Sequence, residues 1–156
     1  MQVRDVMTAR PMTIDPEAPL ETAVAVMRER RVRHLPVVDD AGRLVGIVTD
    51  RDLRSAILGP AIAEYASTTD RGRLQALAGD LQDVRVGHVM TRGALTTGPD
   101  ASVAQAAAVM ADARVGSLPV VEGQRLVGIL TEHDVLKALA ATLPAVKGAD
   151  PDEYFW

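Results

Sequence analysis

Apolar residues recur along this chain at two kinds of spacing. In residues 20–27 and again in residues 103–110 they stand at i, i+3, i+4 and i+7, which predicts two helices that each bury one face. Pro19 suits the first turn of the first helix, and Asp100 is a plausible N-cap for the second. The same element is therefore predicted twice.

Short continuous apolar runs follow each helix. They come in pairs separated by a few polar or glycine residues, which predicts two β-hairpins. Because the runs do not alternate with polar residues, both faces of these strands should be covered. A short extended piece precedes each helix and a further helix closes each unit. The predicted strands are Leu35–Val38, Leu44–Val48, Leu118–Val121 and Leu126–Leu130, the extended pieces are 12–14 and 95–97, and the closing helices are 52–58 and 134–143.

The two halves also match residue by residue. Residues 35–53 read LPVVDDAGRLVGIVTDRDL, and residues 118–135 read LPVVEGQRLVGILTEHDV. Upstream, Val6-Met7-Thr8 recurs 83 positions later as Val89-Met90-Thr91. The chain is thus an internal duplication, and two copies of one small unit are expected to pack together with a ligand cleft between them.

The repeat sets the expected domain boundaries. Residues 1–58 form the first unit and residues 86–143 the second. Residues 59–85 have no counterpart in the second copy and are interpreted as a helical linker insertion. Residues 144–156 form an acidic tail that ends in three aromatic residues, which could dock on a partner or fray.

Composition narrows the class of protein. The chain has 156 residues, 47% of them hydrophobic and only 3% aromatic, so aliphatic side chains must build the core. It has no cysteine, which fits a reducing compartment, and we expect a cytoplasmic location without a membrane anchor because no apolar run approaches about 20 residues. A net charge of −4 makes nucleic acid an unlikely partner.

The strongest local signal is the junction between each hairpin and its closing helix. It reads Thr49-x-x-Asp52 in the first copy and Thr131-x-x-Asp134 in the second. A threonine three residues before an acid is close to a capping box, which would stabilise the helix start and do nothing else. A helix N-terminus also suits a phosphate, and a carboxylate suits the hydroxyls of a ribose. Both interpretations stay open at this point.

Familiar catalytic patterns are missing. The sequence has no glycine-rich phosphate loop with its lysine, no HExxH pair and no GxSxG elbow. We therefore expect neither an enzyme nor a metal site.

The repeat, the Leu-Pro-Val-Val strand and the duplicated Gly-hydrophobic-hydrophobic-Thr-x-x-Asp junction together resemble a tandem pair of cystathionine-β-synthase (CBS) domains, a Bateman module. The resemblance covers the chain apart from residues 59–85 and the tail. It implies an α/β (α+β) fold of two pseudo-symmetric β-α-β-β-α units packed sheet to sheet. It also implies a non-catalytic regulatory module that binds an adenine nucleotide or a related adenosyl ligand in clefts between the units, with no tightly bound cofactor.

The resemblance assigns ligand-binding residues. The junction acids would hold ribose hydroxyls, the junction threonines would contact phosphate with help from Arg51 or His133, and apolar residues would enclose the adenine. The expected set is Thr49, Arg51, Asp52, Arg33, His34, Val32, Ile14, Met90, Val115, Gly116, Ser117, Thr131, His133 and Asp134.

Arginines are concentrated in the first copy, at positions 28, 30, 31, 33 and 51. The cleft built on Thr49 and Asp52 is therefore expected to prefer the more highly charged phosphate tail. Family resemblance further implies a homodimer and a target protein on another chain. Two alternatives remain: a ligand-independent dimerisation or scaffold module, and a nucleic-acid binder that uses the arginines of residues 28–33.

Overall fold

The computed structural model describes residues 1–56 and 83–143. Most of the expected insertion and the whole aromatic tail lie outside these ranges. The elements in chain order are η1 (Val3–Asp5), β1 (Thr8–Ala9), α1 (Leu20–Arg30), β2 (His34–Val38), β3 (Leu44–Thr49), α4 (Val86–Val89), β4 (Thr91–Arg92), α5 (Val103–Ala113), β5 (Ser117–Glu122), β6 (Arg125–Thr131) and α6 (Glu132–Thr142). Residues 50–56 are also helical.

Both helices predicted from apolar spacing are present. In α1 the side chains of Leu20, Ala23 and Met27 are buried, whereas Val24 stays 38% exposed. The cap predicted for the second helix was wrong. Ser102 is the N-cap of α5, and its hydroxyl accepts the backbone N–H of Gln105 at 3.0 Å. The side chain of Asp100 instead pairs with Arg4.

Both predicted hairpins are confirmed. β2 pairs antiparallel with β3, β5 pairs antiparallel with β6, and each pairing shifts register once near its turn. The first turn is held by Asp39, whose Oδ1 accepts the backbone N–H groups of Ala41 and Arg43 at 3.0 and 2.9 Å. Gly42 and Gly123 take positive φ values of 75° and 63° in the two turns, a conformation that glycine adopts without steric cost.

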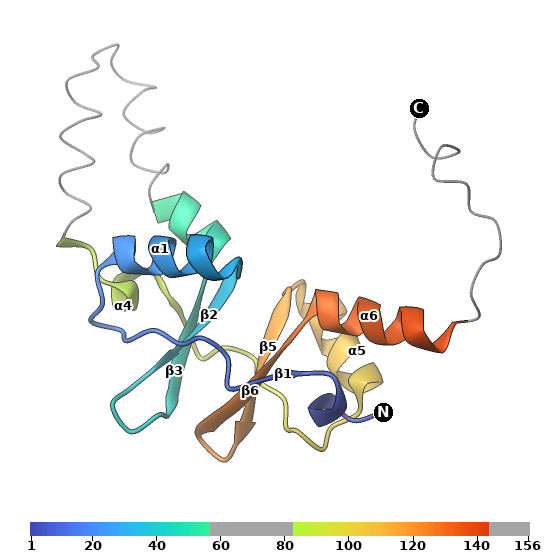
Figure 1. Cartoon of the computed structure of the whole chain (residues 1–156). Coiled ribbons are helices and arrows are strands. Elements are labelled where there is room, and N and C mark those ends of the chain that lie inside the picture. Colours follow the sequence, from blue (N-terminus) through green and yellow to red (C-terminus); the bar gives the residue numbers. More distant parts are fainter. Residues whose placement is uncertain (57–82, 144–156) are drawn as a thin grey trace, which may run out of the picture.

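The extended piece before each long helix runs parallel to the first strand of the hairpin. Ile14 forms a parallel bridge with Val37, and Thr97 forms the equivalent bridge with Val120. Each unit therefore follows the order β-α-β-β-α, and the mixed α+β class is confirmed. Figure 1 shows the two units side by side, with both hairpins pointing to the same end of the molecule.

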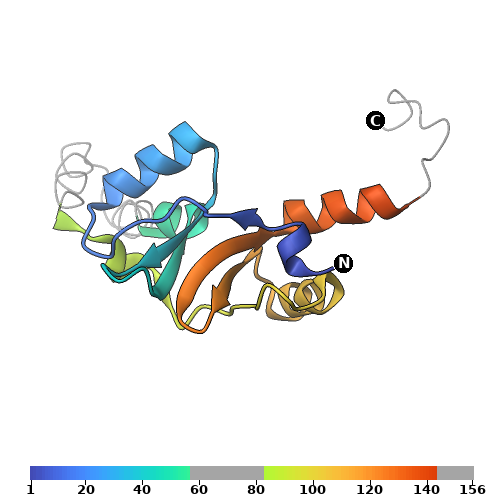
Figure 2. The same cartoon turned by 60° about the horizontal axis from the view of Figure 1, so that its bottom comes forward.

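Two short strands cross between the units. β1, from the start of the chain, pairs with β6 of the second unit, and β4, from the start of the second copy, pairs with β3 of the first. The sheet orders are β1-β6-β5 and β2-β3-β4. In Figure 2 the β1 arrow runs beside β6. The spatial units thus differ from the sequence segments 1–58 and 86–143, because each segment lends its first strand to the other.

The cores show the same exchange. Val86 and Met90, which follow the insertion, are buried with Leu35 and Val48 of the first unit. Val3, near the start of the chain, is buried with the core of the second unit. Apolar burial therefore ties both units to segments that are remote in the sequence.

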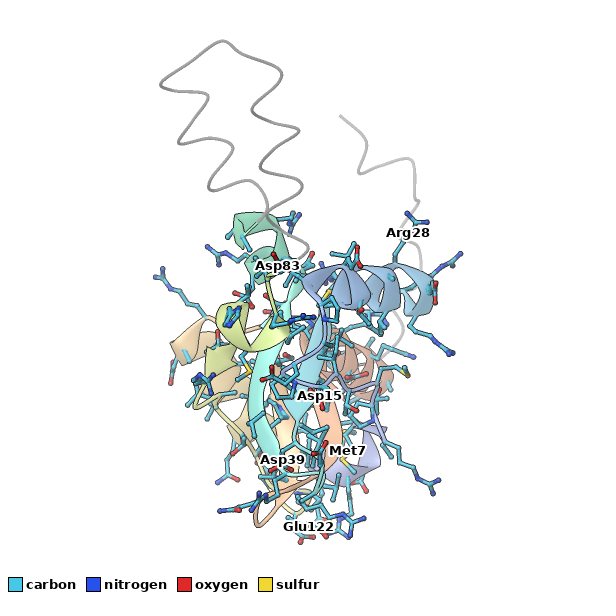
Figure 3. All side chains as sticks on the ribbon, turned by 90° about the vertical axis from the view of Figure 1, so that its left-hand side faces the viewer. Met7, Asp15, Arg28, Asp39, Asp83 and Glu122 are labelled. Atoms are coloured by element: carbon cyan, nitrogen blue, oxygen red, sulfur yellow. The ribbon has the colours of Figure 1, made fainter. Side chains whose placement is uncertain are left out.

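The hairpin tips also touch. The backbone N–H of Leu44 donates to the carbonyl oxygen of Gln124 at 3.0 Å, and Arg43 forms an antiparallel bridge with Arg125. Asp39 and Glu122, which belong to these two turns, lie at the same end of the molecule in Figure 3. The two units are joined at the hairpin tips as well as through the exchanged strands.

Candidate functional site

The two threonine–aspartate junctions have nearly the same geometry. Oδ2 of Asp52 accepts both the backbone N–H and the hydroxyl of Thr49, each at 2.8 Å, and the backbone N–H of Asp52 returns to the Thr49 hydroxyl at 3.2 Å. In the second copy the corresponding distances between Thr131 and Asp134 are 2.9, 2.6 and 3.3 Å. Both junctions are therefore capping boxes.

Capping leaves half of each carboxylate free. The two bonds that the Asp52 side chain accepts, and the two that Asp134 accepts, all end on Oδ2, and within the described ranges Oδ1 has no protein donor. An ionised carboxylate accepts hydrogen bonds through both of its oxygens. Each acid can thus cap its helix and still receive a hydroxyl group from a ligand.

The hydroxyl groups of the two junction threonines are already hydrogen-bonded within the protein. The hydroxyl of Thr49 donates its single hydrogen to the Asp52 carboxylate, and the hydroxyl of Thr131 donates its hydrogen to the Asp134 carboxylate. Such a group cannot also donate to a phosphate oxygen unless it breaks that bond. The arginine side chains that line both clefts also carry donors for an anion.

Each acid opens into its own cleft. The cleft at Asp52, here the Asp52 cleft, has a volume of about 690 Å³ and combines the helix start of the first unit with residues 113–117 of the second. The cleft at Asp134, the Asp134 cleft, has a volume of about 460 Å³ and combines the helix start of the second unit with residues 31–34 of the first. Both clefts are therefore built between the units, and their volumes lie in the range of small-molecule sites.

The two clefts share one wall. Arg33, His34, Gly116 and Glu132 line both of them. A Cβ atom built on Gly116 would lie 3.2 Å from His34 Nε2 and 3.6 Å from the Glu132 carboxylate. The absence of a side chain at Gly116 thus leaves room for both groups beside this position.

Most of the expected ligand-binding residues line a cleft. The Asp52 cleft contains Thr49, Arg51, Val115 and Ser117 in addition to Asp52, and the Asp134 cleft contains Val32, Thr131 and His133 in addition to Asp134. Ile14 and Met90 do not line either cleft. Both are buried in the core of the first unit, with 6% and 8% of their surfaces exposed, so the structure does not bring them into the clefts with the other expected residues.

The arginines are distributed more evenly between the two clefts than the sequence suggested. Three line only the Asp52 cleft, at positions 51, 54 and 114, together with the carboxylates of Asp50 and Asp52. Two line only the Asp134 cleft, at positions 10 and 31, together with the carboxylate of Asp134. Arg28 and Arg30 line neither, and Arg28 points outward from α1 in Figure 3. The concentration of arginines in the first copy therefore does not concentrate charge in one cleft.

The pKa of His34 is changed by this setting. Burial lowers its pKa below the ordinary value, and the neighbouring Arg33 guanidinium lowers it further, while Asp50, Glu132 and Asp52 act in the opposite direction. A lowered pKa keeps the imidazole neutral at pH 7. His34 can thus offer the shared wall a hydrogen bond without adding a positive charge.

Several cleft residues were not among those expected from the sequence. Ile47 and Ile129 line one cleft each and are almost buried, at 7% and 6% exposure, so each gives its cleft an apolar surface. Both stand two residues before the junction threonine, a repeat position that could have revealed them. Arg10 and Arg54 carried no such signal, because their counterparts one repeat later are Gly93 and Leu136.

Comparison with known proteins agrees with this architecture. A family model for the CBS domain matches residues 3–59 and 86–141. The chain therefore belongs to the CBS-domain family and carries the domain twice.

Relatives place the pair in different settings. A CBS domain-containing protein of Dictyostelium discoideum is 33% identical over 145 residues, which cover 92% of this chain and 94% of that protein. A homoserine O-acetyltransferase of Methanococcoides burtonii is 36% identical over 134 residues, 85% of this chain but only 23% of that enzyme. The match to the enzyme thus concerns less than a quarter of its length.

Two solved structures share the fold over almost the whole chain. CBSX2 in complex with AMP, a CBS-pair protein of Arabidopsis thaliana, has a TM-score of 0.71 and 31% identity, covering 90% of this chain and 96% of that one. The CBS domain pair of protein MJ0100, in complex with 5′-methylthioadenosine and S-adenosyl-L-methionine, has a TM-score of 0.72 and 25% identity, covering 92% and 98%. Both of these relatives hold adenosyl compounds.

Membrane-spanning character is absent from the described helices. None of those in residues 1–56 and 83–143 combines the length and the hydrophobicity that a bilayer crossing requires.

Proposed function

We propose that this CBS pair is a non-catalytic regulatory module that binds an adenine nucleotide or a related adenosyl ligand in the Asp52 and Asp134 clefts. The observation that carries the proposal is made twice: a capping acid whose Oδ1 has no donor among the described residues lines a cleft together with arginines and one isoleucine. A ribose, a phosphate and a flat apolar base find matching chemistry there. The AMP and S-adenosylmethionine complexes of the two structural relatives support the same ligand class.

Binding would act by shifting a population. Because each cleft has walls from both units, a ligand that contacts both walls favours the arrangement in which they lie at the right separation. The signal would then pass to another chain, either a second copy or a separate target protein. Regulation rather than catalysis is proposed because the cleft groups suit recognition of an adenosyl ligand and the sequence carries no familiar catalytic motif.

Thermal denaturation with a ligand panel tests this function. AMP, ADP, ATP, NADH, S-adenosylmethionine and 5′-methylthioadenosine are each added at millimolar concentration. A ligand present at about 100 times its dissociation constant stabilises the folded chain by about 2.7 kcal/mol per site, which should raise Tm clearly. If no adenosyl compound moves Tm and isothermal calorimetry detects no heat, the scaffold alternative replaces this proposal. Strongly salt-dependent binding of an oligonucleotide would instead favour the nucleic-acid alternative.

An apolar helix face supports the proposed homodimer. Leu136 and Leu139 on α6 are 62% and 51% exposed. Near them Ala107, Ala111 and Val135 line a shallow depression of about 270 Å³. Large apolar side chains grouped on one surface are typical of a protein interface.

Charge placed on this face should break the dimer. Leu136→Glu and Leu139→Glu each bury a carboxylate in the proposed interface, so dimerisation should weaken by at least tenfold. Analytical ultracentrifugation over a concentration series measures it, with Leu95→Glu as the control because Leu95 is 48% exposed but lines the Asp52 cleft rather than the depression between α5 and α6. A wild-type chain that sediments as a monomer, or glutamate variants that dimerise as before, would contradict the homodimer.

A further inference from the structure

Three non-glycine residues of the described chain have a left-handed backbone, and all three are arginines. The φ angles are 49° for Arg10, 53° for Arg31 and 56° for Arg114. All three also line the clefts, Arg10 and Arg31 in the Asp134 cleft and Arg114 in the Asp52 cleft. Backbone strain and a guanidinium group thus coincide at the candidate ligand sites.

Helix capping accounts for only two of these residues. Arg31 and Arg114 are the C-caps of α1 and α5, where a left-handed residue ends the helix and a cation suits the helix dipole. Arg10 follows the strand β1 and caps no helix. Its strained conformation therefore needs a different explanation.

The second repeat supplies a natural comparison. The position 83 residues after Arg10 is Gly93, which follows β4 and has a φ angle of 61°. The backbone bend is thus the same in both units, and glycine makes it without strain. Arginine at this bend carries a steric cost that glycine avoids. We expect the side chain of Arg10 to have a function that offsets this cost.

The surroundings of Arg10 indicate what that function is. The charged and titratable groups that line the same cleft are Arg31, Arg33, His34, Glu132, His133 and Asp134. No ion pair within residues 1–56 and 83–143 involves Arg10, whereas Arg54 in the Asp52 cleft is already paired with Asp50 at 3.0 Å. Arg10 is therefore available to an anion that enters the cleft, and arginine binds phosphate through two parallel hydrogen bonds.

We propose that Arg10 is a specificity-determining residue of the Asp134 cleft, which it makes selective for adenosyl ligands that carry a phosphate over those that do not. Gly93 leaves the equivalent place in the Asp52 cleft without such a group. This inference rests on the proposed function, since it assumes that adenosyl ligands enter these clefts. It adds a chemical difference between two clefts that the repeat makes otherwise similar.

Exchanging the two residues tests the proposal. Arg10→Gly copies the second repeat, and Gly93→Arg copies the first, with open space around the added Cβ. Isothermal calorimetry with AMP and with adenosine gives the ratio of their affinities at each site. Arg10→Gly should lower the AMP affinity of one site about tenfold, in line with the loss of one charged hydrogen-bonding group, while adenosine affinity stays the same. Gly93→Arg should raise AMP affinity at the other site.

The unliganded proteins give a second readout. Arg10→Gly should raise Tm by about 2–4 °C because it relieves the left-handed strain, and Gly93→Arg should lower Tm by a similar amount. Arg28→Ala is the control, since it removes the same charge from the outer surface of α1, where the side chain lines neither cleft. Its ratio of AMP to adenosine affinity should match that of the wild-type chain.

The possible failures are distinguishable. If Arg10→Gly raises Tm but leaves the ratio of AMP to adenosine affinity unchanged, Arg10 is only a strained turn residue and this inference is overturned while the proposed function stands. The inference is overturned in the same way if Arg28→Ala lowers the ratio as much as Arg10→Gly does. If the wild-type chain binds neither AMP nor adenosine nor any other compound of the panel, the proposed function fails and this inference fails with it.

Discussion

Replacing Gly46 by alanine should destabilise the folded chain by about 1–3 kcal/mol, the usual cost of overpacking a tight site. A Cβ atom at Gly46 would lie 2.8 Å from the backbone oxygen of Thr91 and 2.8 Å from the sulfur of Met90. The oxygen belongs to β4, which pairs with β3 at this point, so it cannot move without separating the exchanged strand. Urea denaturation followed by circular dichroism measures the loss.

The second repeat again offers the matched control. The three atoms nearest to a Cβ atom at Gly128 would all belong to the side chain of Met7, with its sulfur at 2.5 Å. A methionine side chain is flexible and can turn away. The alanine also restricts the unfolded chain, which stabilises by about 0.4–1 kcal/mol. Gly128→Ala should therefore cost much less than Gly46→Ala, and equal losses at the two positions would show that β4 does not press on β3 as described.

Replacing Asp52 or Asp134 by asparagine should remove most of the ligand affinity of one cleft and little of the stability. The amide oxygen of asparagine can still accept the two donors of the threonine, but the free carboxylate oxygen becomes an NH₂ group that cannot accept a ribose hydroxyl. A hydrogen bond to a charged group contributes about 1.5–3 kcal/mol, so affinity should fall roughly 10- to 150-fold. Calorimetric titration with AMP measures the affinity, and a melt without ligand measures the stability.

The alanine variants separate the two roles of these acids. Asp52→Ala and Asp134→Ala remove both the cap and the free oxygen, so they should lose ligand affinity and also about 1 kcal/mol of stability. A test on alanine alone would be ambiguous, because the structure gives each acid a capping contact whether or not a ligand binds. Asparagine variants that bind AMP as tightly as the wild-type chain would show that the acids only cap their helices.

Local patterns were enough to predict the elements of the fold. The apolar spacing placed α1 and α5, and the polar turns placed both hairpins, because each of these features depends on neighbours within a few residues. Ser102 was missed in favour of Asp100 because both types of residue can cap a helix. In the structure the Asp100 carboxylate pairs with Arg4, which is far away in the sequence.

Contacts between distant segments could not be predicted in the same way. The strands β1 and β4 are two residues long and carry no periodic signal, so their exchange between the units is visible only in the structure. The exchange also explains the position of Met90. This residue lies one position before β4 and is therefore carried into the core of the first unit, away from the clefts.

The arginines illustrate the same limit at the candidate site. Their number in the first copy was plain from the sequence, but their distribution depends on how the units face each other. Arg31 belongs to the first copy and lines the cleft of the second, while Arg114 does the reverse. A sequence repeat therefore predicts that two similar clefts exist. It does not predict which residues one copy contributes to the cleft of the other.

The exchanged strands have a consequence for how the duplication can be taken apart. A fragment that contains a single sequence repeat would lack the third strand of its own sheet. It would also carry a short strand whose pairing partner lies in the missing repeat. Such a fragment exposes an unpaired strand edge, which invites aggregation or pairing with another fragment. The two repeats are accordingly expected to unfold in a single cooperative transition, and neither repeat is expected to fold on its own.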